Sequence, residues 1–465
     1  MPKNKLMIKK IQLLSLLFVC VLGKAQTNPV ITSWLQNNTL TGTYYVSGNP
    51  VAIPNNILVN CQKVEYSPSN VYVTTTGVPA YPTGPFLDGN PSNATNQNAI
   101  FKFPLNPAQN TGSATATTGG NIGVFINGVA LFDYRDGVSW NAATNALCGG
   151  PGNPPCPGGP GANLPWNRDA IPAERAGFDC SKAHPAMGNY HHHQNPSAFK
   201  LDITVISTIC SVYDANGLYS IDSAKHSPLI GYAYDGFPIY GAYGFKNANG
   251  TGGIARIKSS YQLRSITTRT SSPSGATVTA GPVVSATYPL GYFREDYEFI
   301  SHAGQDDYLD VHNGRFCITP EYPAGIYCYF ATVDNKWNSA YPYVVGPTFY
   351  GVYANRKVTS VTETTTTYSL VTNNTGMLKL KNETIDVNVF PNPSNDFIAI
   401  QYVGLNTENL NVELFDVLGK LVQKTILNQG SAIAYLDTKT IYAGNYVVKI
   451  SGSNVITTKN VVIFK

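Results

Sequence analysis

The chain is patterned for short β-strands rather than for helices. Two apolar segments flank Asn127-Gly128 within residues 122–132, and two aromatic segments flank Asp235-Gly236 within residues 232–240. Asn-Gly and Asp-Gly between apolar runs are strong signals for a tight hairpin turn. No long stretch repeats apolar residues with the period of a helix. The pattern therefore predicts an all-β, loop-rich fold.

A change of composition divides the chain near residue 356. Residues 358–367 and 373–376 consist mostly of Thr, Ser and Asn, which is typical of a polar linker. Apolar and polar residues alternate again at 387–390 and 412–415, as in half-buried strands. We therefore expect a large β domain at 26–355, a linker at 356–384 and a small immunoglobulin-like β-sandwich at 385–465.

Residues 1–25 have the pattern of a secretory signal peptide. Four lysines precede an apolar run at 11–22, and small residues lead to Ala25. The run has about a dozen residues, whereas a helix needs roughly 20 to cross a bilayer. We therefore expect cleavage after Ala25, no permanent membrane span, and a protein that works outside the cytoplasm.

The net charge excludes some partners. The chain has 31 Lys and Arg against 27 Asp and Glu, and residues 1–25 contain five of the basic residues and no acidic one. The remaining 26 basic and 27 acidic residues give the mature chain a charge of −1. Binding to nucleic acid or to an anionic membrane requires clustered Lys and Arg. Neither partner is expected.

Seven cysteines follow residue 25, so at least one has no partner within the chain. Cys148 and Cys156 bracket a loop rich in Gly and Pro, and Cys317 and Cys328 bracket a predicted turn. In an oxidising compartment both pairs are candidates for local disulfides. A zinc site of four thiolates is disfavoured because the chain has no close Cys-x-x-Cys pair.

Four of the seven histidines lie at 184 and 191–193. Successive side chains of a strand face opposite ways, so His191 and His193 share one face while Tyr190 and His192 share the other. With His184 as a third ligand, His191 and His193 predict a site for Zn, Cu or Fe, which imidazole does not distinguish. The alternative is an exposed strand end whose histidines only form hydrogen bonds.

Further ligand candidates are Asp235 and the group His302, Asp310 and His312. Asp235 lies in the predicted Asp-Gly turn, where turn formation alone explains an aspartate. The other three belong to a run that also contains Asp306 and Asp307 and does not fit the calcium-loop pattern. A solvated acidic loop is the alternative interpretation of that run.

The last domain resembles the type A C-terminal sorting domain of type IX secretion substrates. The resemblance rests on Val389-Phe390-Pro391-Asn392-Pro393, on Leu414-Phe415-Asp416-Val417-Leu418-Gly419-Lys420, and on Ala443-Gly444-Asn445-Tyr446-Val447-Val448-Lys449-Ile450. It implies translocation across the outer membrane of a Bacteroidetes-type bacterium by the type IX machinery. Secretion or attachment to the cell surface is then expected.

The large domain resembles the YHYH-domain proteins over residues 110–350. The matching motifs are Gly188-Asn189-Tyr190-His191-His192-His193, Gly231-Tyr232-Ala233-Tyr234-Asp235-Gly236-Phe237-Pro238 and Asn313-Gly314-Arg315-Phe316. The second Tyr of the family motif is His192 here. Because that position faces away from His191 and His193, the departure leaves the paired ligands intact. The resemblance implies a fold and a site but no reaction.

These observations support two hypotheses of different classes. The first is a secreted or cell-surface protein that binds a metal through the histidine cluster, with a metalloenzyme as its catalytic form. The second is a non-catalytic adhesin or glycan-binding module, which requires an exposed aromatic platform and histidines whose side chains diverge. The sequence lacks the signatures of serine hydrolases, zincins and nucleotide-binding enzymes. Under either hypothesis, the partner of the protein would be an extracellular glycan or a small-molecule substrate.

Overall fold

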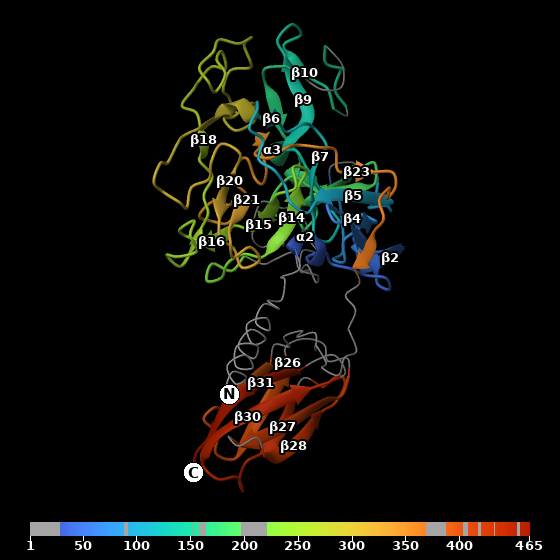
Figure 1. Cartoon of the computed structure of the whole chain (residues 1–465), viewed down its shortest axis with the longest axis vertical. Helices are drawn as coiled ribbons and strands as arrows, with labels where there is room; N and C mark the ends of the chain where they lie inside the picture. The colour runs from blue at the N-terminus through green and yellow to red at the C-terminus, as the bar shows by residue number, and fades with distance from the viewer. Residues whose placement is uncertain are drawn as a thin grey trace, which may run out of the picture. The chain divides into compact units, whose positions relative to one another are not determined.

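The structure of the protein is a computed structural model. It describes residues 28–87, 92–150, 152–157, 164–196, 221–368, 387–402, 408–416, 420–431, 433–452 and 456–465. The chain forms two compact units, Met1–Ser369 and Leu370–Lys465, each built of strands (Figure 1). The predicted signal peptide lies outside the described residues. The all-β prediction is confirmed.

An eight-stranded mixed sheet forms the centre of the large unit. Its order is β12 (Ala183–Ala186), β13 (Asn189–His192), β8 (Ala130–Phe132), β7 (Asn121–Phe125), β14 (Leu229–Ala233), β15 (Pro238–Tyr240), β21 (Ile326–Phe330) and β20 (Gly314–Cys317). The pairs β7–β8 and β14–β15 are the two hairpins predicted from Asn-Gly and Asp-Gly. Two parallel contacts, β13–β8 and β15–β21, join segments that are distant in the chain.

A second sheet of five strands lies in the same unit. Its order is β23 (Lys357–Val358), β5 (Ala99–Pro104), β4 (Asn70–Thr75), β3 (Cys61–Tyr66) and β24 (Thr366–Tyr368). Its two edge strands come from the range 356–384, which we expected to be a linker. Glu363 between them accepts from Lys102 Nζ at 2.6 Å and from Tyr72 at 2.8 Å. Residues 357–368 are thus part of the large unit.

Aromatic side chains join the two sheets in one core. Trp34 follows the short helix α2 (Pro29–Thr32), and its ring lies 5.6 Å from that of Phe103 on β5 and 5.4 Å from that of Tyr232 on β14. All three side chains are buried. Because the apolar faces of both sheets meet here, the large unit is a β-sandwich with long loops around it.

Smaller sheets extend from the sandwich. They are β10 (Ala146–Cys148), β9 (Arg135–Asn141) and β11 (Asn167–Asp169), and the pairs β1 (Thr41–Val46) with β2 (Asn49–Leu58), β16 (Tyr243–Phe245) with β17 (Ile254–Arg256), β18 (Tyr261–Leu263) with β19 (Tyr297–Phe299), and β22 (Thr348–Phe349) with β6 (Thr115–Ala116). The remaining helical turns are α3 (Ala170–Glu174), η1 (Arg175–Gly177) and η3 (Arg294–Asp296).

One of the two predicted disulfides is formed. Cys148 at the end of β10 is bonded to Cys156, eight residues later, and both are buried. Cys317 and Cys328 are free thiols, as is Cys61. The predicted hairpin is present, but its register places Cys317 opposite Ile326 and Cys328 opposite Arg315. The two thiols are therefore diagonal neighbours rather than a directly opposed pair. Cys180 is also disulfide-bonded.

Replacing Cys156 by Ser should lower the free energy of unfolding by about 2–3 kcal/mol, because the bond closes a short loop in the unfolded chain. Chemical denaturation followed by tryptophan fluorescence measures this, since all four tryptophans lie in the large unit. The control is Thr144→Ala, an exposed position in the β9–β10 hairpin. An unchanged denaturation midpoint in Cys156→Ser would show that the bond does not stabilise the fold.

The small unit is the predicted immunoglobulin-like sandwich. One sheet contains β25 (Val387–Phe390), β26 (Phe397–Tyr402) and β29 (Ile433–Asp437), and the other contains β28 (Leu421–Leu427), β27 (Leu410–Asp416), β30 (Gly444–Ser451) and β31 (Ile456–Ile463). Apolar residues from both sheets form its core. Tyr446 donates to the carbonyl of Tyr442 at 2.8 Å, a corner contact common in such folds.

The sorting-motif residues take structural positions in this unit. Asn392 donates to the Asn460 carbonyl and accepts from the Val462 amide, both at 2.9 Å, so the segment from Pro391 to Pro393 is fixed against the last strand. Gly444 begins β30. Gly419 lies outside the described residues.

No helix in the described part of the chain is long and apolar enough to cross a membrane.

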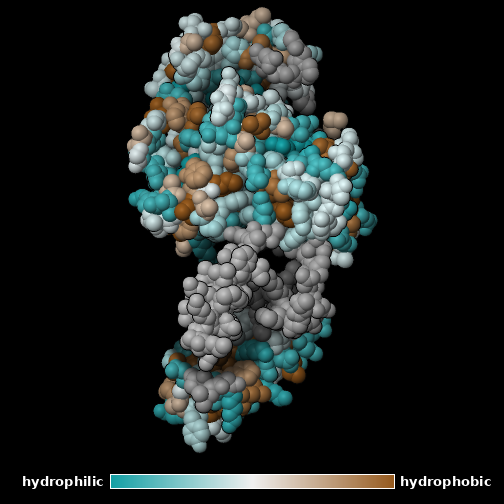
Figure 2. Space-filling view, in the orientation of Figure 1, coloured by the Kyte–Doolittle hydropathy of each residue, from teal (hydrophilic) through white to brown (hydrophobic). Residues whose placement is uncertain are grey.

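The visible face of the large unit in Figure 2 mixes hydrophilic residues with small hydrophobic patches. This distribution is normal for a protein surface in contact with water.

Candidate metal centre

The hairpin of β12 and β13 brings three histidines together at one edge of the eight-stranded sheet. Its turn is Met187-Gly188, where both residues have positive φ, at 50° and 84°. A Cβ on Gly188 would lie 2.2 Å from Thr95 Oγ1, so only glycine fits. With this turn, His184 on β12 pairs directly with His191 on β13.

The imidazoles of His191 and His193 converge as the strand alternation predicts. Their Nε2 atoms are 3.1 Å apart. The Nδ1 atom of His191 is 2.9 Å from the Asn189 carbonyl, and that of His193 is 2.6 Å from the Asp133 carbonyl. A carbonyl oxygen only accepts hydrogen bonds, so both Nδ1 atoms carry the proton of the neutral ring. The two Nε2 atoms that face each other therefore present lone pairs.

His184 and a carboxylate complete the cluster. The ligand atoms of His184, His191 and His193 all lie within 4.8 Å of one another. Oε2 of Glu174 is 3.2 Å from Nε2 of His184 and 3.2 Å from Nε2 of His193. This oxygen is shielded from solvent and forms no hydrogen bond with a described residue beyond these two contacts. Three imidazoles and one carboxylate oxygen thus lie close together.

Helix α3 positions Glu174 as its last residue. Asp169 caps the helix by accepting from the Ile171 amide at 2.9 Å, and its other oxygen accepts from the Tyr343 hydroxyl at 2.6 Å. The Ala170 amide donates to the Tyr134 carbonyl at 2.8 Å. The start of the helix is therefore fixed to the sandwich core, which fixes the direction of its last side chain. Sequence reasoning missed Glu174.

Two phenylalanines cover the imidazoles. The ring of Phe132 on β8 stacks on His191 with centroids 3.7 Å apart, and the ring of Phe178 lies 4.9 Å from that of His184. The side chains of His184 and His193 are only 9% and 4% exposed, whereas that of Glu174 is 23% exposed. The carboxylate side of the cluster is therefore its least buried side, although Oε2 itself is shielded.

The electrostatics of the cluster keep its groups ready to bind a cation. Burial, followed by the neighbouring His193 and His184, lowers the pKa of His191 well below its usual value. Burial raises the pKa of Glu174, whereas hydrogen bonds and charge from His184 and His193, when these rings are protonated, lower it well below the usual value. A neutral imidazole and an ionised carboxylate are the forms that bind metals.

The other face of β13 is structural. Nδ1 of His192 donates to the Lys182 carbonyl at 3.2 Å, and its Nε2 accepts from the Tyr81 hydroxyl at 2.8 Å. Tyr190 donates to Asp179 at 2.7 Å. Burial lowers the pKa of His192 to about 3 and raises the pKa of Asp179 to about 7. His192, where the family motif has its second Tyr, is thus a satisfied core residue.

The other predicted ligands lie elsewhere and have other partners. Asp235 accepts from the Tyr329 hydroxyl at 2.6 Å and from the Gly351 amide at 2.8 Å. Asp310 accepts from Tyr327, the His312 ring lies 2.6 Å from the Thr348 hydroxyl, and the His302 ring stacks on Tyr308. None of the four belongs to the metal-ligand group found among the described residues.

The acidic run is held in place by contacts of its own. Asp307 forms an ion pair with Lys258 at 2.8 Å, and Asp306 accepts from the Ala248 amide at 2.8 Å. These contacts account for the run without a metal.

The fold and this site define an exported β-sandwich protein with a buried histidine cluster. The chain belongs to the family of YHYH proteins, whose profile matches residues 100–343. The secretion system C-terminal sorting domain matches residues 388–464 and makes the chain a secreted or surface-attached substrate of the type IX machinery. No curated protein matches the chain.

Proposed function

We propose that the chain binds one transition metal ion through His184, His191 and His193, with Glu174 as the fourth ligand. The observation that carries the proposal is the convergence of lone pairs in a buried space. The Nε2 atoms of His191 and His193 cannot donate to each other, because both Nδ1 protons are used by carbonyls. Only a cation or an added proton makes their 3.1 Å contact favourable.

The spacing of the four atoms suits a metal. Ligands bound at about 2.0–2.1 Å to one tetrahedral ion lie about 3.3 Å from each other. Three of the six contacts among these atoms, at 3.1, 3.2 and 3.2 Å, are close to that value, and the three histidine ligand atoms lie within 4.8 Å of one another. Metal-binding histidines commonly donate their second ring nitrogen to a carbonyl, as His191 and His193 do. Three imidazoles and one carboxylate suit Zn, Cu or Fe.

The hypothesis of a non-catalytic adhesin requires histidine side chains that diverge, whereas these converge. A metalloenzyme is favoured by one further feature, the partial exposure of Glu174. An ion held there by the three histidines would polarise a bound water or substrate, and Glu174 would be placed to accept a proton beside it.

Replacing Glu174 by Gln should weaken metal affinity by about tenfold to a hundredfold, because the amide keeps the shape but loses the charge. Competition titration with a chromophoric chelator, using Zn²⁺ or Cu²⁺ and the full chain, measures the change. Arg175→Gln is the matched control, since Arg175 is the next residue and is exposed. Equal affinities for Glu174→Gln, Arg175→Gln and the wild-type chain would remove Glu174 from the ligand set.

In this proposal, both ends of the chain take part in its export from the cell. Residues 1–25 would direct passage across the inner membrane, and the sorting domain then engages the type IX machinery. The large unit would carry the metal centre outside the cell.

A further inference from the structure

One cavity of the large unit lies apart from the histidine cluster. Its volume is about 640 Å³, and its walls contain none of the four proposed metal ligands. It opens between the insertion 264–296, the strands β18 and β19 that flank this insertion, and the loops before β11 and β22. At about 30 Å³ per water molecule, this space holds roughly twenty waters. It is within the usual range of about 300–1,000 Å³ for small-molecule sites.

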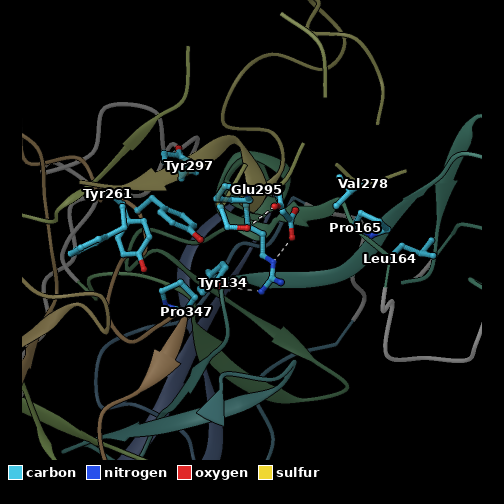
Figure 3. A pocket seen from close by; sticks show the side chains of 14 residues that line it. Tyr134, Leu164, Pro165, Tyr261, Val278, Glu295, Tyr297 and Pro347 are labelled. Carbon is cyan, nitrogen blue, oxygen red and sulfur yellow. Dashed lines mark hydrogen bonds and ion pairs between the residues drawn. The ribbon is translucent and has the colours of Figure 1, made fainter. Parts of the chain in front are cut away.

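One wall of the cavity is aromatic. Tyr297 and Tyr341 stack with centroids 4.0 Å apart, and Tyr261 meets Tyr341 edge to face at 5.5 Å. Phe299 meets Tyr261 at 5.5 Å and is 36% exposed. Figure 3 shows Tyr261, Tyr297 and Tyr134 on one side of the cavity, with Leu164, Pro165 and Val278 on the other. These rings hold one another in place, so little side-chain entropy is lost when a ligand binds.

A partly buried ion pair forms the polar part of the cavity. Arg294 Nε pairs with Glu295 Oε1 at 2.5 Å, and Arg294 Nη1 lies 3.4 Å from the Tyr134 hydroxyl. Glu295 also accepts from the amide and side chain of Asn167, at 2.8 and 2.9 Å. Among the described residues, Glu295 and Tyr134 are thus two side chains that lie against the five guanidinium hydrogens of Arg294. The hydroxyls of Ser272 and Ser274 add further hydrogen-bonding groups.

The charges that line the cavity disfavour a charged ligand. Arg294 and Glu295 are the only ionised residues among the described side chains that line the cavity, and they neutralise each other. An anionic ligand would find no unpaired positive charge to offset its desolvation. The cavity therefore suits a neutral ligand that has one apolar face and several hydroxyl groups.

We propose that this cavity binds a neutral saccharide. A pyranose ring presents C–H groups on its faces and hydroxyls on its edge. The faces match the aromatic wall formed by Tyr261, Tyr297 and Phe299, and the hydroxyls match Arg294, Tyr134 and the serines. The volume accepts more than one sugar ring. Binding here does not depend on the metal centre.

The test uses the purified full chain and a panel of neutral oligosaccharides of glucose, mannose, galactose, xylose and N-acetylglucosamine, followed by calorimetry on any ligand found. Oligouronates and a proline-rich peptide are included as competitors of other chemistry. We expect at least one neutral oligosaccharide to bind. Tyr297→Ala should weaken that binding by about tenfold or more through loss of ring contact.

Two further variants keep the test decisive if Tyr297→Ala fails to fold. Phe299→Ala removes a partly exposed ring, and Ser274→Trp fills the cavity from an exposed position. Both should weaken binding, whereas Tyr442→Ala, an exposed tyrosine of the sorting domain, should not. His191→Ala with His193→Ala should leave it unchanged, which separates this proposal from the metal centre.

Three outcomes would overturn the proposal. They are no binding of any neutral saccharide at millimolar concentration, binding only of uronates or of the peptide, and saccharide binding that Phe299→Ala and Ser274→Trp do not alter.

Discussion

Replacing His191 and His193 together by alanine is expected to abolish stoichiometric metal binding. The change removes two of four proposed ligands, whose Nε2 atoms are 3.1 Å apart. Structural zinc sites contribute about 10–16 kcal/mol in total, so the loss of half the ligands should weaken affinity at least about a thousandfold. Elemental analysis after loading with Zn²⁺ and desalting measures the metal retained per chain.

The same variant should lose the stabilisation that the metal gives. A ligand at a hundred times its Kd raises the free energy of unfolding by about 2.7 kcal/mol. The wild-type chain should therefore melt at a higher temperature with Zn²⁺ than with chelator, and the variant should not. His226→Ala is the control, because this partly buried histidine lies outside the cluster. A variant that retains one metal per chain would contradict the proposed ligands.

Replacing Arg269 by Met is expected to destabilise the large unit by about 3–5 kcal/mol, the cost of leaving a buried partner charge unpaired. Arg269 and Asp296 have fully buried side chains and form two bonds, at 2.7 and 2.8 Å. The guanidinium also donates to the carbonyls of Pro282, Tyr288 and Pro289. These bonds hold together residues 264–296, a long segment with little regular structure.

Tryptophan fluorescence during urea denaturation measures this change, since Trp166 packs against Phe293 in the same segment. The control is Lys225→Ala, which breaks an exposed ion pair with Asp222 and should leave stability nearly unchanged. Because residues 264–296 also form part of the cavity wall, Arg269→Met should lose saccharide binding as well. An Arg269→Met chain as stable as Lys225→Ala would show that the ion pair is dispensable.

Local patterns predicted the local structure well. Asn127-Gly128 and Asp235-Gly236 form turns because they supply the backbone conformations that tight hairpins need. The alternation of strand residues placed His191 and His193 on one face, because that rule depends only on the backbone. His184 joined them through the same hairpin. The sheet order could not be predicted, because β13–β8 and β15–β21 are contacts set by tertiary packing.

The linker prediction failed and Glu174 was missed for physical reasons. Residues 357–368 have the composition of a linker, but β-branched threonines also suit edge strands, and β5 and β3 offered free edges. Glu174 could not be found from the sequence because it ends a five-residue helix and belongs to no recognisable motif. Only the capping of that helix by Asp169 and the packing of the sandwich bring its carboxylate to the histidines.

The two proposals place separate sites on the scaffold of the large unit. The histidine cluster lies at the β12–β13 edge, and the aromatic cavity lies at the insertion 264–296. A surface protein with both features could bind a glycan at one site and carry metal chemistry at the other. The selective loss of each activity in the variants above would show whether the two sites work independently.

X-ray absorption spectroscopy of the metal-loaded full chain reports the atoms bound to the metal. We expect a first shell of nitrogen and oxygen at about 2.0–2.1 Å, with the outer-shell scattering of three imidazole rings. His191→Ala with His193→Ala should remove that signature. A first shell without imidazole scattering, or with sulfur ligands, would contradict the proposed metal centre.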